Sequence, residues 1–341
     1  MASTTATGRS VAEPAPPVGE PEAPAGLASP TSGATEGSVD LVDAGTFGGA
    51  EVQAGALGIT RQTQFGDIRR RFFRNKLAVV GLAMVVVVFL TAAFARPLAP
   101  YDPQRQDLTH TQASPSRQHL MGTDEVGRDQ LSRVIYGSRI AVEVGLAAIF
   151  LALVIGVVLG SLAGYLGRAW DTVIMRTADI FFAFPLLIGA IVIILVIGRG
   201  VSSVILALAI FSWATVARLL RSSILSIREA EYVEAARSLG ASRLRIVLRH
   251  VLPNSLAPVL VYAAVSVAVA VVAEASLSFL GVGVGVEVPD WGNMIAAGEK
   301  FFGYKNYLWV CPSLAVVFTV LGFVFVGDGL RDALDPKLRG S

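Results

Sequence analysis

The sequence predicts an all-α integral membrane protein with six transmembrane helices. Of the 341 residues, 53% are hydrophobic and only 16% are charged, which is too apolar a balance for an ordinary soluble domain. Six runs almost free of charged residues are each long enough to cross about 30 Å of hydrocarbon as a helix. These runs are residues 77–95, 144–166, 180–198, 201–217, 256–273 and 308–327.

Residues 1–64 are rich in Pro, Gly, Ala, Ser and Thr and contain no long apolar run. Such a segment cannot bury enough apolar surface to order itself, so we expect a disordered cytoplasmic tail. Because the first apolar run begins only at residue 77, a cleaved signal peptide is not expected. An unstructured extension is favoured over a docking arm, and no function is assigned to the tail.

Residues 65–98 are predicted to form the first transmembrane helix with a basic flank. Cations crowd that flank, and a second group of arginines lies between the fourth and fifth apolar runs. By the positive-inside rule both groups belong in the cytoplasm, so both chain termini, including a tail at 331–341, are expected inside. The flanking cations are Arg69, Arg70, Arg71, Arg74 and Lys76.

Residues 99–139 are predicted to be extracytoplasmic because they follow the first helix. Their arginines are interspersed with acidic residues, which weakens the pull of the positive-inside rule on this segment. Leu131, Val134 and Ile135 recur at helical spacing near its end, which predicts an interfacial helix there.

Residues 140–330 contain the other five helices and are expected to form the core. In the second helix, small residues recur every four positions and form a ridge where another helix can approach closely. Pro185 removes a backbone hydrogen bond in the third helix and predicts a kink. The ridge consists of Ala148, Ala152, Gly156, Gly160 and Gly164.

Residues 228–254 form a charged cytoplasmic insert between the fourth and fifth helices. The first part favours a helix with acidic residues at its amino end, and Gly240 is expected to end that helix in the left-handed conformation. A second helix is expected to start at Ser242 and to stop at Pro253. Its predicted apolar face contains Leu244, Val247, Leu248 and Val251.

The first helix of the insert is a candidate binding element. Ala235 and Ala236 leave it narrow enough to enter a groove on another protein. Tyr232 and Val233 would offer apolar contact there, and Glu234 would offer a hydrogen-bonding group. The alternative is a helix that lies on the inner leaflet, where arginines hold it against anionic lipid. The spacing alone does not decide between these.

The triplet Glu234-Ala235-Ala236, followed by Gly240 and Leu252-Pro253, resembles the EAA loop of permease subunits in ATP-binding-cassette importers. Other stretches between residues 65 and 338 resemble the second, C-type permease subunit of dipeptide/oligopeptide importers. The amino-terminal tail is longer than the family pattern, and the resemblance does not extend to it. The stretches are Gly122-Thr123-Asp124, Leu131-Ser132-Arg133, Ser212-Trp213, Leu277-Ser278-Phe279-Leu280-Gly281, Trp291-Gly292 and Gly327-Asp328-Gly329-Leu330-Arg331-Asp332.

The resemblance implies a type I importer-like permease of six helices, whose cytoplasmic coupling helix docks on an ATPase subunit. It also implies a bacterial plasma (inner) membrane location and no nucleic-acid partner. The implied partners are a second homologous permease subunit, two cytoplasmic ATPase subunits or domains, an extracytoplasmic peptide-binding protein and membrane lipid. The residues carried over to the coupling contact are Tyr232, Val233, Glu234, Ala235, Ala236 and Gly240.

A catalytic role for this chain is not expected. The sequence contains no Gly-x-x-x-x-Gly-Lys-Ser/Thr loop, so ATP and Mg²⁺ are expected in the partner subunits and no cofactor in this chain. The three histidines are scattered, and Cys311 is the lone cysteine, so neither a metal site nor a nucleophile–base set is indicated.

Glu274 is the candidate residue for the pathway or its outer mouth. A carboxylate inside a membrane segment is costly and usually faces protein or water. Counting about 1.5 Å per residue from Pro253 places it near the outer boundary. It is expected either to shape the outer mouth or contact a binding protein, or to have a structural role in which it pairs with Arg199 or Lys300 or caps a backbone group.

The resemblance implies that the cargo is a di- or oligopeptide, with nickel or glutathione as alternatives. A more distant alternative is a secondary transporter driven by an ion gradient. Such a transporter should show carboxylates near the middle of the bilayer and inverted repeats, and neither is evident in the sequence.

Overall fold

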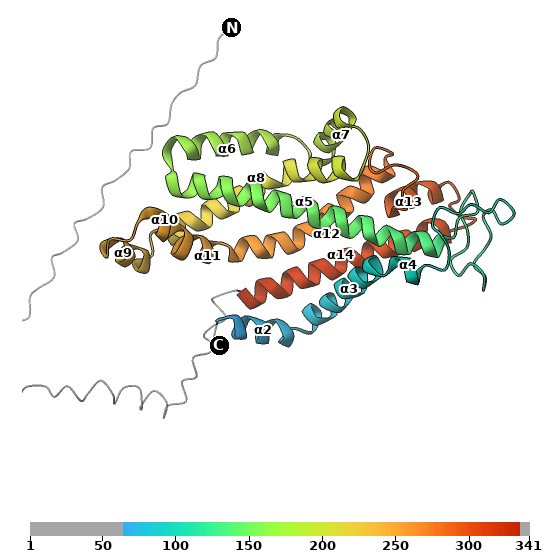
Figure 1. Ribbon diagram of the computed structural model, residues 1–341, viewed down its shortest axis with the longest axis horizontal. Helices are drawn as coiled ribbons and strands as arrows, with labels where there is room; N and C mark the ends of the chain where they lie inside the picture. Colours follow the sequence, from blue (N-terminus) through green and yellow to red (C-terminus); the bar gives the residue numbers. More distant parts are fainter. Residues whose placement is uncertain (1–63, 335–341) are drawn as a thin grey trace, which may run out of the picture. The chain divides into compact units, whose positions relative to one another are not determined.

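The computed structural model describes residues 64–334, which form helices and loops without a β-strand (Figure 1). The predicted tail at 1–64 therefore lies outside the described residues except for Gln64. The elements in chain order are α2 (Gln64–Arg74), α3 (Lys76–Ala93), α4 (Ala95–Leu98), α5 (Gln130–Leu166), α6 (Arg168–Ala183), α7 (Leu186–Ile197), α8 (Val201–Ile227), α9 (Glu231–Ser238), α10 (Arg243–Ile246), the π-turn η1 (Val247–Val251), α11 (Leu252–Ser255), α12 (Ala257–Phe279), α13 (Trp291–Glu299) and α14 (Tyr307–Leu334).

Five helices are long and apolar enough to span a membrane: α3, α5, α8, α12 and α14. The pair α6 and α7 makes a sixth span if it is counted as one, but it is bent by 93°. The bend predicted at Pro185 is confirmed, but it is a break between two helices at Phe184 and Pro185 and not a kink within one helix over residues 180–198. Phe184 is extended (φ −99°, ψ 131°), as the residue before a proline prefers, and Pro185 has no N–H to continue the helix.

Two predicted boundaries are also wrong because helices continue through them. Leu131, Val134 and Ile135 belong to α5, which runs unbroken for 37 residues, and not to a separate interfacial helix. Likewise, α8 continues ten residues beyond the predicted end at 217 to Ile227. Charged residues in this extension pair with α6: Arg218 lies 2.6 Å from Asp179, and Arg221 pairs with Asp171.

The predicted glycine ridge packs α5 against α8, the most extensively contacting pair of helices in the described chain. A Cβ at Gly156 would lie 2.5 Å from the Val216 side chain, and one at Gly160 would lie 2.7 Å from the Ala217 carbonyl. Close backbone approach is therefore the reason for small residues here, as predicted.

The predicted first helix, 65–98, consists of three helices, because α2 and α4 flank the membrane-spanning α3. Asn75 separates α2 from α3 and caps α3 by accepting from the N–H groups of Leu77 (3.0 Å) and Ala78 (3.2 Å). Its amide also donates to Asp332 near the end of α14, at 3.0 Å. The end of α14 extends to Leu334, so the predicted tail at 331–341 begins as helix.

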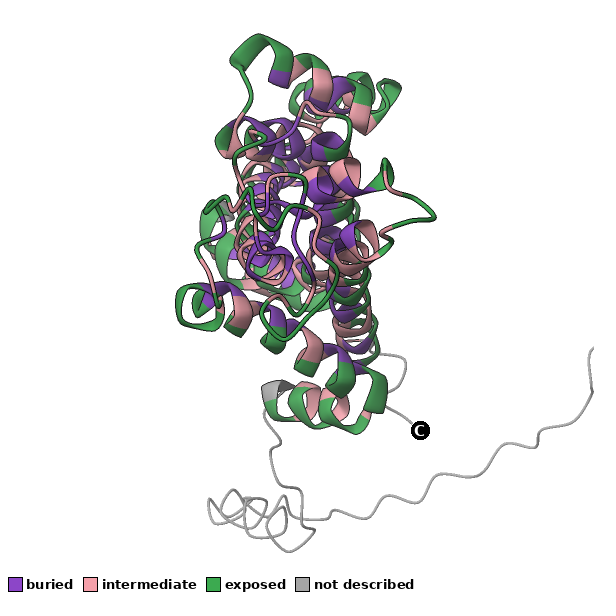
Figure 2. Ribbon diagram, turned by 90° about the vertical axis from the view of Figure 1, so that its right-hand side faces the viewer, coloured by how far each residue is buried: buried purple, intermediate pink, exposed green. Residues whose placement is uncertain are grey.

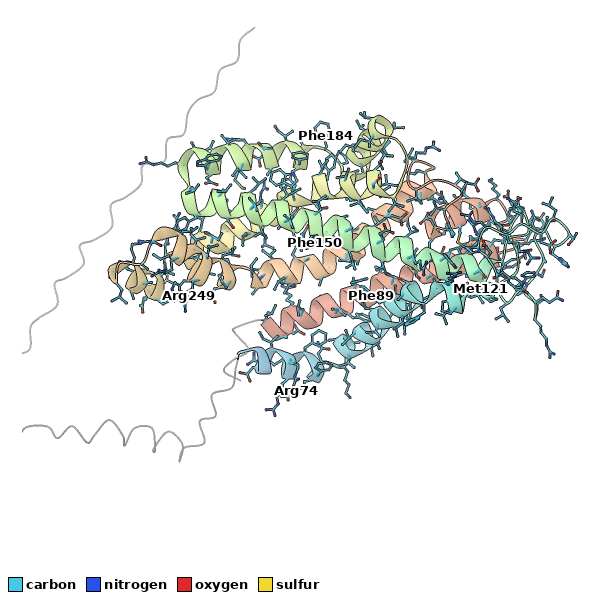
Figure 3. The ribbon with its side chains drawn as sticks, in the orientation of Figure 1. Arg74, Phe89, Met121, Phe150, Phe184 and Arg249 are labelled. Atoms are coloured by element: carbon cyan, nitrogen blue, oxygen red, sulfur yellow. The ribbon has the colours of Figure 1, made fainter. Side chains whose placement is uncertain are left out.

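The loop between α4 and α5 and the helix α13 lie together at one end of the described helices. Figure 3 places Met121 at this end, whereas Arg74 and Arg249 lie at the other. Figure 2, which faces the loop end, shows buried segments surrounded by exposed loops. The two predicted sites, the insert and Glu274, therefore belong to opposite ends of the helices.

Candidate coupling surface

The insert between α8 and α12 folds as predicted into a short helix, α9, followed by a return to the membrane (Figure 1). Val233 of α9 is fully buried and packs in a cluster with Leu220 and Ile224 of α8. The same cluster includes Ile246, Val251 and Val259, so α9 shares an apolar core with both membrane helices that flank it. The prediction that Val233 offers its side chain to a partner is therefore wrong, because Val233 holds α9 to its own chain.

The opposite side of α9 faces away from this cluster. Tyr232 is 47% exposed and Leu239 is 88% exposed, and Ala235 between them is also exposed. These positions follow the i, i+3, i+7 spacing of one helix face. Glu234 is exposed beside them, whereas Ala236 is half-buried against the cluster. We call Tyr232, Glu234, Ala235 and Leu239 the coupling surface.

Leu239 was not among the predicted contact residues. The sequence signal that could have identified it is a large apolar residue directly before the glycine that ends a helix. Such a residue either packs inward in the glycine-ended cap or is left exposed. At 88% exposure it is left exposed, and a large apolar side chain in this position is a candidate contact for another protein.

Gly240 ends α9 in the left-handed region, with φ +80°, as predicted. Its N–H donates to the Arg237 carbonyl at 3.0 Å, and the Ala241 N–H donates to the Ala236 carbonyl at 3.1 Å. This pair of bonds is a Schellman motif. A Cβ at Gly240 would meet nothing within 4 Å, so backbone conformation and not space selects glycine there.

The predicted second helix of the insert is interrupted by a π-turn. Ser242 starts it, with a long 3.4 Å bond from the Arg245 N–H to the Ser242 hydroxyl, but α10 ends at Ile246. Pro253 was predicted to stop this helix. It lies instead in the first turn of α11, so that prediction is wrong. The side-chain amide of Asn254 donates to the carbonyl of His250 at 2.7 Å.

The extra residue of the π-turn changes the buried face that the sequence predicted. Ile246 and Val251 point into the core, whereas Leu244 is 68% exposed and Leu248 is 56% exposed. Of the four residues predicted to form the apolar face, only Val251 is fully buried. Two more exposed leucines lie beside α9 as a result.

A cationic contact joins the insert to a third membrane helix. The Arg228 guanidinium, at the end of α8, donates to the Gly164 carbonyl near the end of α5 at 3.3 Å. The start of the insert therefore contacts α5 through Arg228, while α9 contacts α8 and α12 through Val233.

Glu274 lies near the opposite end of α12 and is only 1% exposed. The Ser278 hydroxyl donates to its Oε1 atom at 3.1 Å. The predicted pairing with Arg199 or Lys300 is wrong, because Lys300 lies 3.8 Å from Glu125 and no described cation forms an ion pair with Glu274. Its suggested role at the outer mouth stays a prediction.

Glu274 interacts with the side chain of Asp290, the N-cap of α13, which accepts from the Asn293 N–H at 2.9 Å. Burial raises the pKa of the Asp290 carboxyl above its ordinary value. Gly292 permits this contact, since a Cβ there would lie 2.2 Å from the Ala275 carbonyl. Asp290 directly precedes a helical pattern, which is the sequence signal that could have identified it as a cap.

No group of three or more His, Cys, Asp or Glu residues in the described part of the chain is placed to hold a metal ion. The fold and the insert together define a multi-pass helical membrane protein with a short helix exposed outside its spans.

Comparison with known families identifies this class. Residues 156–340, more than half of the chain, match the family described as the binding-protein-dependent transport system inner membrane component. Residues 63–115 match the N-terminal TM domain of oligopeptide transport permease C. The chain belongs to the family of binding-protein-dependent transport system inner membrane components.

Curated relatives cover most of the chain. It is 41% identical over 280 residues to the glutathione transport system permease protein GsiD of Escherichia coli O6:K15:H31, covering 82% of this chain and 92% of that protein. It is 39% identical over 266 residues to the dipeptide transport system permease protein DppC of Alkalihalophilus pseudofirmus, covering 78% and 88%. An inward-facing structure of the MetNI methionine ABC transporter matches the fold with a TM-score of 0.50 at 22% identity, covering 60% of this chain and 97% of that chain.

Proposed function

We propose that this chain is one of two homologous permease subunits in an ATP-driven importer of di- and oligopeptides. The observation that carries the proposal is the two-sided α9, with Val233 buried in the membrane helices' core and the coupling surface turned outward. Peptide cargo is supported by relatives named for dipeptide and glutathione transport, because glutathione is itself a small peptide. Glutathione is the second candidate cargo.

In the proposed mechanism, the coupling surface docks in a groove of a cytoplasmic ATPase subunit that binds ATP and Mg²⁺. Closure of the ATPases would displace α9, and Val233 would pass that displacement to α8 and α12. A complete switch between inward and outward states, from 1:99 to 99:1, needs about 5.5 kcal/mol of differential binding. This chain would transmit that energy without performing catalysis itself.

The proposed orientation has α9 and both termini in the cytoplasm of a bacterial cell. It is supported by Arg69, Arg70 and Arg71 at the same end as the insert. The loop between α4 and α5 and the helix α13 would then face the extracytoplasmic peptide-binding protein.

The test is ATP hydrolysis and peptide uptake by the complete transporter in proteoliposomes. Glu234→Lys replaces a carboxylate with a cation, which a partner surface that binds a carboxylate would repel. Gly240→Val forces a β-branched residue into the left-handed region. Both variants should insert into the membrane but lose peptide-stimulated ATP hydrolysis and uptake.

Matched controls separate coupling from general damage. Glu229→Lys makes the same charge change in the turn before α9, outside the coupling surface. Gly281→Val imposes comparable backbone strain after α12, where φ is +77° and a Cβ would also meet open space. Both controls should retain most uptake. Normal uptake by Glu234→Lys and Gly240→Val together would contradict the coupling assignment.

A further inference from the structure

The break between α6 and α7 leaves a cavity of about 310 Å³ among the membrane-spanning helices. Its walls come from the break itself, from α8 and from α12, and Phe184, labelled in Figure 3, lies at its edge. The volume is at the lower end of the range for small-ligand sites. Broken helices that border such a space are a recurrent way for transporters to form a substrate site within the membrane.

The cavity lies about halfway across the membrane. Ser212 is about 16 Å along α8 from its first residue, and Ser266 is about 14 Å along α12 from its first residue, at 1.5 Å per residue. A hydrocarbon core of about 30 Å therefore places both near its middle. Cargo crossing the bilayer must pass this depth.

Three serine and threonine hydroxyls line the cavity without a hydrogen-bond partner in the described chain, those of Ser212, Thr215 and Ser266, and the Tyr262 phenol is a fourth unpaired hydroxyl there. Ser266 is only 6% exposed. Several hydroxyls elsewhere in the described helices are satisfied by the carbonyl four residues earlier, although that of Ser161 in α5 is not. Examples are Ser255 to Val251 at 2.8 Å, Ser276 to Val272 at 2.7 Å and Thr319 to Ala315 at 2.8 Å. The cavity hydroxyls do not form this bond, which leaves them available to a ligand.

The remaining walls are apolar and aromatic, and no charged residue lines the cavity. Phe181 and Phe211 meet edge to face, with ring centroids 5.6 Å apart. The Phe211 ring packs directly on Gly189 of α7. A larger residue would not fit there, because a Cβ at Gly189 would lie 2.0 Å from the ring. The site therefore combines fixed aromatic surface with uncharged groups that can both donate and accept hydrogen bonds.

We propose that this cavity contacts the peptide cargo during its passage, with Ser212, Thr215 and Ser266 bonding to its backbone amide and carbonyl groups. This inference rests on the proposed function. The aromatic walls would contact cargo side chains without selecting their charge. A lipid acyl chain is the less favoured occupant, because it would leave all three hydroxyls unpaired.

The experiment measures uptake of the dipeptide Ala-Ala by the complete transporter in proteoliposomes. Ser266→Ala removes one hydroxyl and should lower uptake about three- to tenfold, the worth of one hydrogen bond. Stimulated ATP hydrolysis should persist, because the coupling surface is untouched. Ser276→Ala is the matched control on the same helix, since its hydroxyl bonds to Val272 and does not line the cavity. Ser212→Ala replaces Ser266→Ala if the latter fails to fold.

A second cargo distinguishes a contact from a structural defect. Alanyl-sarcosine lacks the peptide N–H, so it cannot donate that hydrogen bond. The preference for Ala-Ala over alanyl-sarcosine should fall about three- to tenfold in Ser266→Ala relative to wild type. Selection by the binding protein is the same in both transporters and cancels. A structural defect would slow both cargoes equally.

The outcomes separate this inference from the proposed function. Wild-type transporter that imports no small peptide with ATP would overturn the proposed function. Wild-type import together with unchanged rate and preference in Ser266→Ala and Ser212→Ala would overturn the cavity assignment alone. A photoreactive benzoylphenylalanine at Phe184 should capture peptide during turnover, and capture of lipid alone would also overturn it.

Discussion

The two ends of this permease, the insert and the loop end, are stabilised by different kinds of interaction. At the insert, apolar packing around Val233 connects α9 to α8 and α12, Arg228 bonds the end of α8 to α5, and large apolar side chains such as Leu239 are left exposed. At the loop end, buried charged groups are paired with hydrogen bonds. The insert is therefore attached mainly by apolar packing, whereas the loop end is held by buried charged groups and their hydrogen bonds.

The loop end shows this pairing most clearly at Asp129, which is 3% exposed. Its carboxylate caps α5 by accepting from the Ser132 N–H and hydroxyl at 2.8 and 2.7 Å, and lies 2.8 Å from His119 Nδ1. Nearby, Arg128 Nε donates to Asp124 at 2.6 Å. Lys305 fixes the loop to the start of α14 by donating to the Gln112 carbonyl at 2.5 Å.

The largest expected effect comes from breaking the loop end at Asp129. Asp129→Ala removes a helix cap and leaves buried donors unpaired, so it should destabilise the fold by about 3–5 kcal/mol. The measurement is thermal unfolding of the purified protein, with protease cleavage reporting on the loop. Asp107→Ala is the control, because Asp107 also accepts bonds from its neighbours but its side chain is 41% exposed. Equal unfolding temperatures for both variants would refute the contrast between the ends.

Effects of intermediate size are expected on α9, where variants of the buried face and the exposed face should differ in what they change. Val233→Ala leaves a cavity in the apolar cluster and should cost about 2 kcal/mol of stability. Tyr232→Ala should leave the unfolding temperature unchanged but reduce stimulation of ATP hydrolysis, because its side chain faces outward. Thermal unfolding and ATPase assays on the same preparations would measure both. A stability loss at Tyr232 with none at Val233 would reverse the assignment of faces.

The smallest expected effect concerns the pH dependence of the loop end. Burial raises the pKa of Asp290, so the folded state favours its neutral form beside Glu274. The associated stability is complete below the unfolded pKa of about 4 and is lost as pH rises through the folded value. Asp290→Asn stays neutral and can still cap α13. It should unfold a few degrees above wild type at pH 8 and approach wild type at pH 4, and a pH-independent difference would contradict this.

Local sequence patterns predicted the features that depend on local chemistry. The apolar runs identified the spans, the ridge at Gly156 and Gly160 identified a packing face, and Gly240 identified a left-handed helix end. Each of these signals requires only the residue type and its spacing.

Features that depend on distant partners were not predictable in this way. The length of α8 depends on Asp171 and Asp179 of α6, which receive its arginines. The inward face of α9 depends on where α8 and α12 place their apolar residues, so Val233 was assigned to the wrong side. Glu274 interacts with Asp290, which lies beyond the end of α12. The spacing of residues along one helix does not reveal this contact.

Site-directed crosslinking in the assembled, ATP-hydrolysing transporter tests the central claim most directly. Single cysteines at Ala235 and Val233, in a Cys311→Ala background, probe the outward and inward faces of the same helix. The account predicts that Ala235→Cys crosslinks to the ATPase subunit and that Val233→Cys does not. Crosslinks from Ala235→Cys to lipid alone during turnover, or to the ATPase only from Val233→Cys, would contradict it.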